Sequence, residues 1–104
     1  MLTIPMIKNF IAEIADKYEL TKVELFGSYA KGKATEDSDL DLLVEFTTPA
    51  VSLIRIISLK YELEDRFQMK VDVVHGPVSK DSLLIIDKVV TIYERQLAGG
   101  QNDS

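Results

Sequence analysis

The sequence predicts one small α/β domain, a mixed β-sheet of about four strands with helices packed on it. Segments with the β-branched content and alternation of strands recur along the chain, and they cover residues 22–26, 39–46, 70–75 and 89–93. Stretches with helical periodicity separate these segments, and this order is typical of a sheet covered by helices. At 104 residues the chain is long enough for one core and too short for a second lobe.

Two long helices have the clearest periodicity. The first is expected to begin after Thr3, which can cap it, with Pro5 in its opening turn. The second is expected over residues 52–67, opened by Ser52. The apolar positions that share one face are Ile7, Ile11, Ile14 and Tyr18 in the first helix and Ile56, Leu59, Leu63 and Phe67 in the second.

The remaining segments predict shorter elements and a tail. Residues 28–34 can form only two turns of helix, because Gly32 is a poor interior residue. A second short helix is expected over residues 79–86. The domain is expected to span residues 1–96, and residues 97–104 have the composition of a disordered tail.

Composition narrows the class of protein. The chain has no cysteine, which excludes a disulfide framework and a thiolate zinc site. Its apolar runs are far shorter than a bilayer requires and its first residues lack the zones of a signal peptide, so a cytoplasmic protein without a membrane segment is expected. The net charge of −5, with scattered basic residues, disfavours direct binding of nucleic acid and suits a basic protein partner or divalent cations.

The stretch "FGSYAKGKATEDSDLD" (26–41) contains two patterns that predict different sites. From Gly27 it nearly matches a Walker A phosphate loop, but Ala34 stands where Ser or Thr must hold Mg²⁺, and no sustained helix follows. Three aspartates from Asp37 onward also fit the start of a calcium loop. That loop requires a turn glycine and a final glutamate, and here those positions are Leu42 and Thr48. Both interpretations are rejected.

Paired carboxylates give the better interpretation. Side chains alternate along a strand, so Asp39 and Asp41 are expected on one side, roughly 6.5–7 Å apart, with the apolar residues opposite. Asp72 lies in the apolar segment "VDVV", where an unpaired charge is costly. If the two strands are neighbours, the three acids face one spot, and two hard metal ions would relieve their repulsion. His75, just beyond Asp72, is expected to be structural.

Gly27 and Ser28 suggest a phosphate site. They follow a strand and are expected to open a short helix, whose first N–H groups are unpaired donors at a positive dipole end. Gly27 allows close approach of the backbone, and Ser28 adds a hydroxyl donor.

Together these residues carry a family resemblance. "GSYAKGKATEDSDLDLLVEF" resembles the signature of the DNA polymerase β-type nucleotidyltransferase superfamily, in which Gly-Ser is followed after ten residues by Asp-x-Asp. The short length and the "VDVV" strand are similar to the minimal nucleotidyltransferases (MNT), over roughly residues 5–95. The resemblance implies a polymerase β-like fold and a transfer reaction that uses ATP or another NTP with two Mg²⁺ ions.

The same resemblance implies roles for individual residues. Asp39 and Asp41 would bind both metal ions, Asp72 would bind the catalytic one, and Gly27 with Ser28 would hold the phosphates of the nucleotide. Lys31 stands where the family commonly has arginine, so the positive charge is kept and the bidentate phosphate contact is lost.

The resemblance also implies a partner. Similar proteins are commonly paired with a small helical HEPN protein, an RNA-cleaving toxin, and some transfer AMP to a tyrosine of that toxin and so act as antitoxins. The absence of a second lobe implies that the acceptor arrives on another molecule or that a homo- or hetero-oligomer builds its pocket. Two alternatives stay open: a non-catalytic binding module that neutralises the partner by occlusion, and a subunit of a small-molecule, antibiotic-type nucleotidyltransferase.

Overall fold

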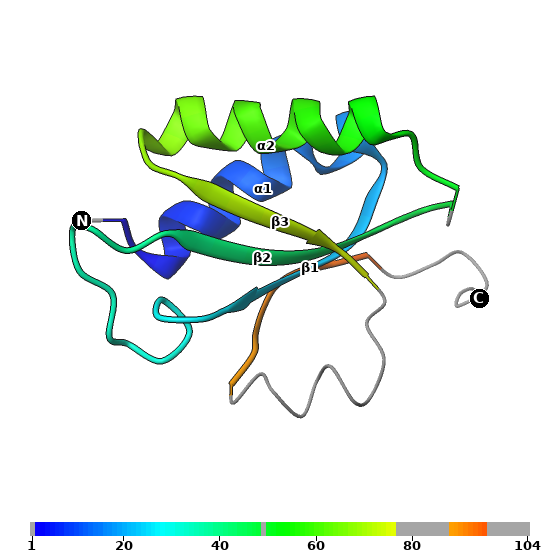
Figure 1. Cartoon of the computed structure of the whole chain (residues 1–104). Coiled ribbons are helices and arrows are strands. Elements are labelled where there is room, and N and C mark those ends of the chain that lie inside the picture. Colours follow the sequence, from blue (N-terminus) through cyan, green and yellow to red (C-terminus); the bar gives the residue numbers. More distant parts are fainter. Residues whose placement is uncertain (1, 49, 77–87, 96–104) are drawn as a thin grey trace.

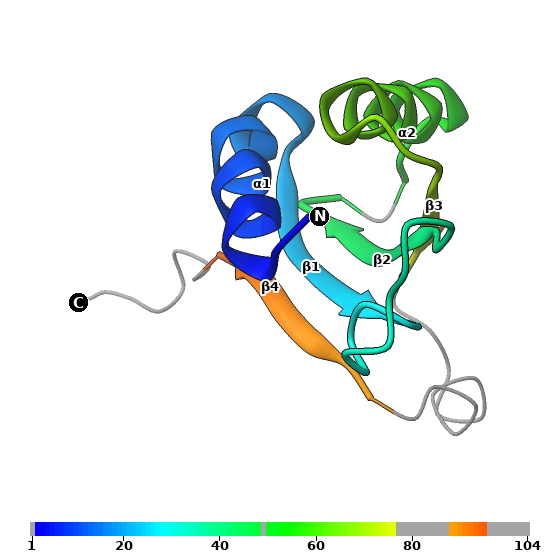
Figure 2. The ribbon, with the colours of Figure 1, turned by 90° about the vertical axis from the view of Figure 1, so that its left-hand side faces the viewer.

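The computed structural model describes residues 2–48, 50–76 and 88–95, and within them two helices pack on one face of a four-stranded sheet (Figures 1 and 2). In chain order the elements are α1 (Ile4–Tyr18), β1 (Leu20–Phe26), β2 (Leu40–Phe46), α2 (Leu53–Phe67), β3 (Val71–His75) and β4 (Val90–Glu94). The predicted mixed sheet with helices packed on it is confirmed.

The strand order is β3-β2-β1-β4. β1 pairs antiparallel with both of its neighbours, whereas β2 and β3 are parallel and are joined through α2. A parallel pair needs such a crossover connection, which explains why a long helix separates these two strands. Because β2 and β3 are parallel, the residues near the beginnings of these two strands lie side by side at the same end of the sheet (Figure 1).

The core lies between the helices and the sheet, and of the predicted helix positions all but Ile56 and Phe67, which are partly buried against it, belong to the core. From the sheet and the two helices it includes Val23, Leu25, Leu42, Val44, Val71, Ile7, Ile11, Leu59 and Leu63, all fully buried. Each side chain of this size stabilises the fold by about 1.5–3 kcal/mol relative to an exposed one. Since these residues alternate along the strands, the residues between them lie on the face that the two helices leave uncovered.

Both helices begin at the predicted caps. Thr3 Oγ1 accepts a hydrogen bond from the Met6 N–H at 3.3 Å, and Ser52 Oγ accepts one from the Arg55 N–H at 3.2 Å. Each helix ends at a residue in the left-handed region, Glu19 with φ 58° and Gln68 with φ 54°. A left-handed residue at this point is a common helix stop, although glycine is more usual there.

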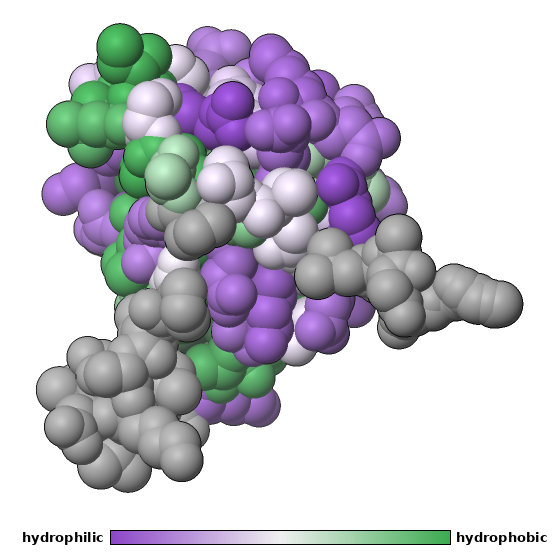
Figure 3. Space-filling model, turned by 90° about the vertical axis from the view of Figure 1, so that its right-hand side faces the viewer, coloured by the Kyte–Doolittle hydropathy of each residue, from purple (hydrophilic) through white to green (hydrophobic). Residues whose placement is uncertain are grey.

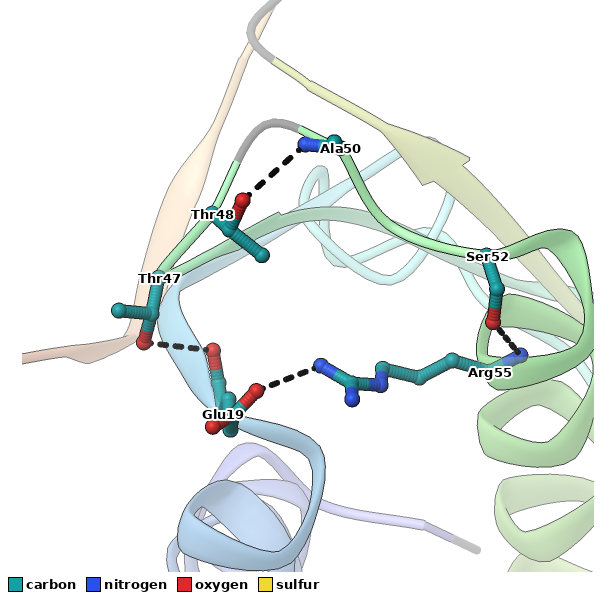
Figure 4. Close-up of polar contacts among 6 residues, drawn as sticks. All are labelled: Glu19, Thr47, Thr48, Ala50, Ser52 and Arg55. Atoms are coloured by element: carbon teal, nitrogen blue, oxygen red, sulfur yellow. Dashed lines mark hydrogen bonds and ion pairs between the residues drawn. The ribbon is translucent and has the colours of Figure 1, made fainter.

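A polar network joins the end of α1 to the loop before α2 (Figure 4). The Glu19 carbonyl accepts hydrogen bonds from the Thr47 N–H at 2.8 Å and from the Thr47 hydroxyl at 3.1 Å. The Glu19 carboxylate pairs with Arg55 at 2.7 Å, and Thr48 Oγ1 accepts from the Ala50 N–H at 3.3 Å. This network fixes the start of α2 at the end of β2 opposite the aspartates.

One predicted element is wrong. The short helix expected over residues 28–34 is absent, and hydrogen-bonded turns take its place, with the Lys31 N–H donating to the Gly27 carbonyl at 3.2 Å. The cause is the backbone at Gly32 inside this segment, whose φ of 70° is incompatible with a right-handed helix. The helix expected over residues 79–86 and the expected tail lie outside the described residues. Within the described residues, no helix is long and apolar enough to span a bilayer.

Candidate active site

Asp41 and Asp72 lie side by side on the face of the sheet that the two helices leave uncovered. They are partners in the parallel register of β2 and β3, and both are half-buried. Their direction follows from alternation, since the neighbouring Leu40 and Val71 are fully buried against the helices. The sequence prediction that these two acids meet is confirmed by this register.

The surroundings of Asp41 disfavour its charged form. Partial burial is the main cause and raises the pKa of the Asp41 carboxyl above its ordinary value. Repulsion from the Asp72 carboxylate, a hydrogen bond with Asp72, and repulsion from Asp39 raise this pKa further, in that order. A cation bound between such carboxylates would reverse this balance.

Asp39 is less closely associated with the pair. It precedes the first residue of β2, so the alternation that sets Asp41 beside Asp72 does not fix the direction of its side chain. Its charge reaches Asp41, but in the described part of the chain no three His, Cys, Asp or Glu side chains are grouped so that they could hold a metal ion. The Asp41–Asp72 pair offers the oxygen ligands that Mg²⁺ prefers, and Asp39 would complete the set by turning toward it.

Gly27 follows the end of β1, next to the start of β2, where Phe26 and Asp41 are register partners. A Cβ atom at Gly27 would lie 2.2 Å from Asp41 Oδ2, so the Asp41 carboxylate or the turn would have to shift. Gly27 therefore leaves the space that the Asp41 carboxylate occupies, a second reason for glycine that sequence reasoning missed. Only the register between β1 and β2 reveals it.

Ser28 and Lys31 lie in the turns that follow Gly27. Ser28 is half-buried and its carbonyl accepts a hydrogen bond from the Lys33 N–H at 2.9 Å, while Lys31 is exposed. The turns that carry the Ser28 hydroxyl and the Lys31 ammonium begin at Gly27, which lies beside Asp41. A turn with a glycine of positive φ can bind phosphate oxygens through its backbone N–H groups, even without a helix.

His75 lies apart from the acids. It follows Asp72 by three residues, roughly 10 Å along the strand, and an odd offset directs it to the opposite face. Its ring packs edge-on against Phe46, with the ring centroids 5.3 Å apart.

The cavity near the ends of the helices is also separate from the acids. It has a volume of about 440 Å³ and is lined by Leu2, Met6, Asn9, Arg66 and Phe67. The aspartates instead lie on the sheet face that the two helices leave uncovered, on the neighbouring strands β2 and β3.

Comparison with known proteins assigns the class of protein. Residues 7–95 match the model of the nucleotidyltransferase domain family, and the chain belongs to this family. The chain is therefore a nucleotidyltransferase, and the resemblance in its motifs is confirmed.

Individual relatives agree with this class. Protein adenylyltransferase MntA of Thermococcus cleftensis is 36% identical over 78 residues, which cover 71% of this chain and 78% of the relative. A solved structure described as a provisionally assigned minimal nucleotidyltransferase superposes with a TM-score of 0.68 and 28% identity, over 86% of this chain and 95% of the other. A chain of the solved complex between the tri-AMPylated HEPN toxin of Shewanella oneidensis and the MNT antitoxin shares the fold, with a TM-score of 0.65, 19% identity, and coverage of 88% of this chain and 73% of the other.

Proposed function

We propose that this protein is an antitoxin that transfers AMP from ATP to a hydroxyl of a partner protein, a tyrosine of a HEPN-type RNase toxin. The observation that carries this proposal is the half-buried Asp41–Asp72 pair beside the Gly27 turn. The relative named protein adenylyltransferase and the fold shared with the antitoxin of an AMPylated HEPN toxin support the choice of nucleotide and acceptor.

In the proposed reaction each residue has one task. The carboxylates of Asp41 and Asp72, with Asp39 turned toward them, would hold the Mg²⁺ ions, and the bound ions would supply positive charge that lowers the pKa of the acceptor hydroxyl and neutralises the leaving pyrophosphate. Ser28 and the backbone at Gly27 hold the triphosphate in line with the acceptor. The acceptor oxygen forms a bond to the α-phosphorus, the bond to pyrophosphate breaks, and the phenolic proton is lost to solvent or to a nearby carboxylate.

The test is to incubate the protein with ATP, Mg²⁺ and an excess of a HEPN-type RNase toxin, and to record the intact mass of the toxin. A transferase should inactivate more than one toxin per antitoxin and add about 329 Da per modified residue, the mass of an adenylyl group. Inhibition that needs one antitoxin per toxin, without a change in mass, would favour the occlusion module. Transfer to an antibiotic and not to the toxin would favour the small-molecule enzyme.

Ser28→Ala tests the phosphate site. Loss of one hydroxyl donor to a charged group costs about 1.5–3 kcal/mol, so ATP affinity should fall roughly ten- to a hundredfold with little change in melting temperature. Isothermal titration with ATP and Mg²⁺ measures this effect, and Ser28→Thr, which keeps the hydroxyl, is the control. Unchanged affinity with lowered stability would show that Ser28 only supports the turn.

A partner of this kind needs a docking surface, and α2 offers one. Leu53, Ile54, Ile57 and Tyr61 are exposed to 69%, 77%, 39% and 62%, and we call them the α2 apolar stripe. Figure 3 shows an apolar area at the upper left of the face that it draws. Large exposed apolar side chains that gather on one helix face are typical of binding surfaces. α2 runs from the end of β2 back to the start of β3, so the Tyr61 end of the stripe is nearer to the start of β3 than the Leu53 end is.

Ile54→Asp tests the α2 apolar stripe. A charge buried at the centre of an apolar interface should weaken toxin binding by roughly thirtyfold or more, which corresponds to about 2 kcal/mol. ATP affinity should not change, because Ile54 is not near the Gly27 turn. Met6→Asp is the matched control, since Met6 is an apolar residue of α1 that is 50% exposed. If Ile54→Asp and Met6→Asp reduced toxin binding equally, the assignment of the α2 apolar stripe to the interface would be contradicted.

A further inference from the structure

Besides the aspartates, the carboxylate of Glu64 on α2 contacts the start of β3. Glu64 Oε2 accepts a hydrogen bond from the Val71 N–H at 3.0 Å and another from Lys60 Nζ at 2.7 Å. Glu64 and Lys60 are one turn apart on α2, and Val71 is the residue immediately before Asp72. One carboxylate therefore joins the helix directly to the strand that carries a predicted metal ligand.

β3 needs such support more than the other described strands of the site do. It is at the edge of the sheet and pairs only with β2, and it is the shorter strand of that pair. At its first residue the side chain of Val71 is fully buried while Asp72 faces the opposite side. A slip at this point would turn Asp72 away from Asp41, because side chains alternate along a strand. The Glu64 bond and the bond from the Leu40 N–H to the Lys70 carbonyl, 3.0 Å long, together hold this register.

Lys60 is the charged partner of Glu64, with 2.7 Å between its ammonium and the carboxylate. Its hydrogen bond with Glu64 is the main reason that its pKa is raised, and attraction to Asp72 adds to the rise. The pKa of Glu64 is lowered by its bonds to Lys60 and to the Val71 N–H, so the carboxylate is favoured as a charged acceptor. The ammonium thus holds the Glu64 carboxylate that accepts the Val71 N–H.

We propose that Glu64 and Lys60 are positioning residues for the proposed transfer reaction: Glu64 holds the start of β3 so that Asp72 faces Asp41, and Lys60 holds the Glu64 carboxylate in place through its hydrogen bond. This inference rests on the proposed function for its effect on rate. Neither side chain contacts the nucleotide site at the Gly27 turn, so ATP binding should not depend on them.

Glu62 provides a matched control on the same helix. Its carboxylate accepts hydrogen bonds from Tyr18 Oη at 2.6 Å and Lys17 Nζ at 2.9 Å, so it ties α2 to α1 and not to β3. Glu62→Gln should lower stability without moving Asp72. Glu64→Gln keeps an oxygen acceptor for the Val71 N–H, whereas Glu64→Ala removes it.

The experiment compares these three variants and Lys60→Gln by steady-state transfer kinetics, by hydrogen exchange of the Val71 amide, and by Mn²⁺ affinity measured with electron paramagnetic resonance. Glu64→Ala should lower kcat roughly ten- to a hundredfold, as expected for a misplaced catalytic group, with KM for ATP unchanged. It should also speed Val71 exchange and weaken Mn²⁺ binding, and Glu64→Gln should recover most of kcat. Lys60→Gln should weaken Mn²⁺ binding less than Glu64→Ala does.

Two outcomes would overturn the inference. One is that Glu64→Ala keeps kcat, Val71 exchange and Mn²⁺ affinity within about twofold of the unchanged protein, a change too small for lost positioning. The other is that Glu62→Gln, at an equal loss of melting temperature, reduces kcat and Mn²⁺ affinity as much. If the unchanged protein transfers no nucleotide, the proposed function fails on its own. Val71 exchange and Mn²⁺ affinity then decide whether Glu64 positions Asp72.

Discussion

Asp41→Asn is expected to abolish AMP transfer and, at neutral pH, to make the protein more stable. The variant loses a charged metal ligand at the centre of the site, so transfer should fall by roughly a thousandfold or more. Stability should rise because partial burial and the neighbouring Asp72 make the negative charge of Asp41 unfavourable in the folded state. Loss of activity with a gain in stability is a combination that damage to the fold does not produce.

The pH dependence of this gain follows from the direction of the pKa shift. The pKa of Asp41 is higher in the folded state than the ordinary value of 3.8, so folding favours the protonated carboxyl. The contribution of Asp41 to stability is therefore fully present below the ordinary value and is lost as pH rises through the raised pKa. Asn does not titrate, so the gain in melting temperature should be large at pH near 7 and absent at pH near 3, in thermal unfolding followed by circular dichroism.

Asp37→Asn is the control for this variant, because Asp37 is an exposed aspartate in the same segment. It should change neither transfer nor stability by a measurable amount. Near-normal transfer by Asp41→Asn would contradict the assignment of Asp41 as a metal ligand. A loss of stability at neutral pH would contradict the account of its surroundings.

Much of the fold could be predicted because local patterns agree with tertiary packing. The alternation in residues 39–46 predicts which face of β2 is buried, and Leu40, Leu42 and Val44 are fully buried as expected. The pairing of Asp41 with Asp72 could be stated only on the condition that their strands are neighbours. The parallel register meets that condition.

The parts that could not be predicted depend on contacts between distant segments or on backbone angles. The turns after Gly27 resemble a helix in composition, and only the positive φ angle of Gly32 excludes one. The bond from the Val71 N–H to Glu64 has no sequence pattern, since an i,i+4 Lys–Glu pair such as Lys60 and Glu64 is common on exposed helices. For this reason the sequence alone does not identify Glu64 as a candidate site residue.

Gly27→Ala is the second variant with a large expected effect, because it strains the backbone of the turn and places a Cβ atom against the Asp41 carboxylate. At φ 76° an L-residue is strained by about 1–2 kcal/mol, and the new Cβ would lie 2.2 Å from Asp41 Oδ2. Either the turn or the Asp41 carboxylate must move. Stability should fall, and transfer and Mn²⁺ binding should both be lost. Thermal unfolding and electron paramagnetic resonance with Mn²⁺ measure these effects.

Gly32→Ala separates the two causes. Gly32 has a similar φ of 70°, but a Cβ there would meet nothing within 4 Å, so this variant has the backbone strain without the collision. The excess destabilisation of Gly27→Ala over Gly32→Ala measures the contact with Asp41. In an Asp41→Ala background the colliding carboxylate is gone, and the excess should shrink by an interaction energy of about 0.5–3 kcal/mol, the usual range for residues in contact. If Gly27→Ala and Gly32→Ala were equally destabilising in both backgrounds, the close approach of Gly27 would not constrain Asp41, and glycine would be required only for the turn.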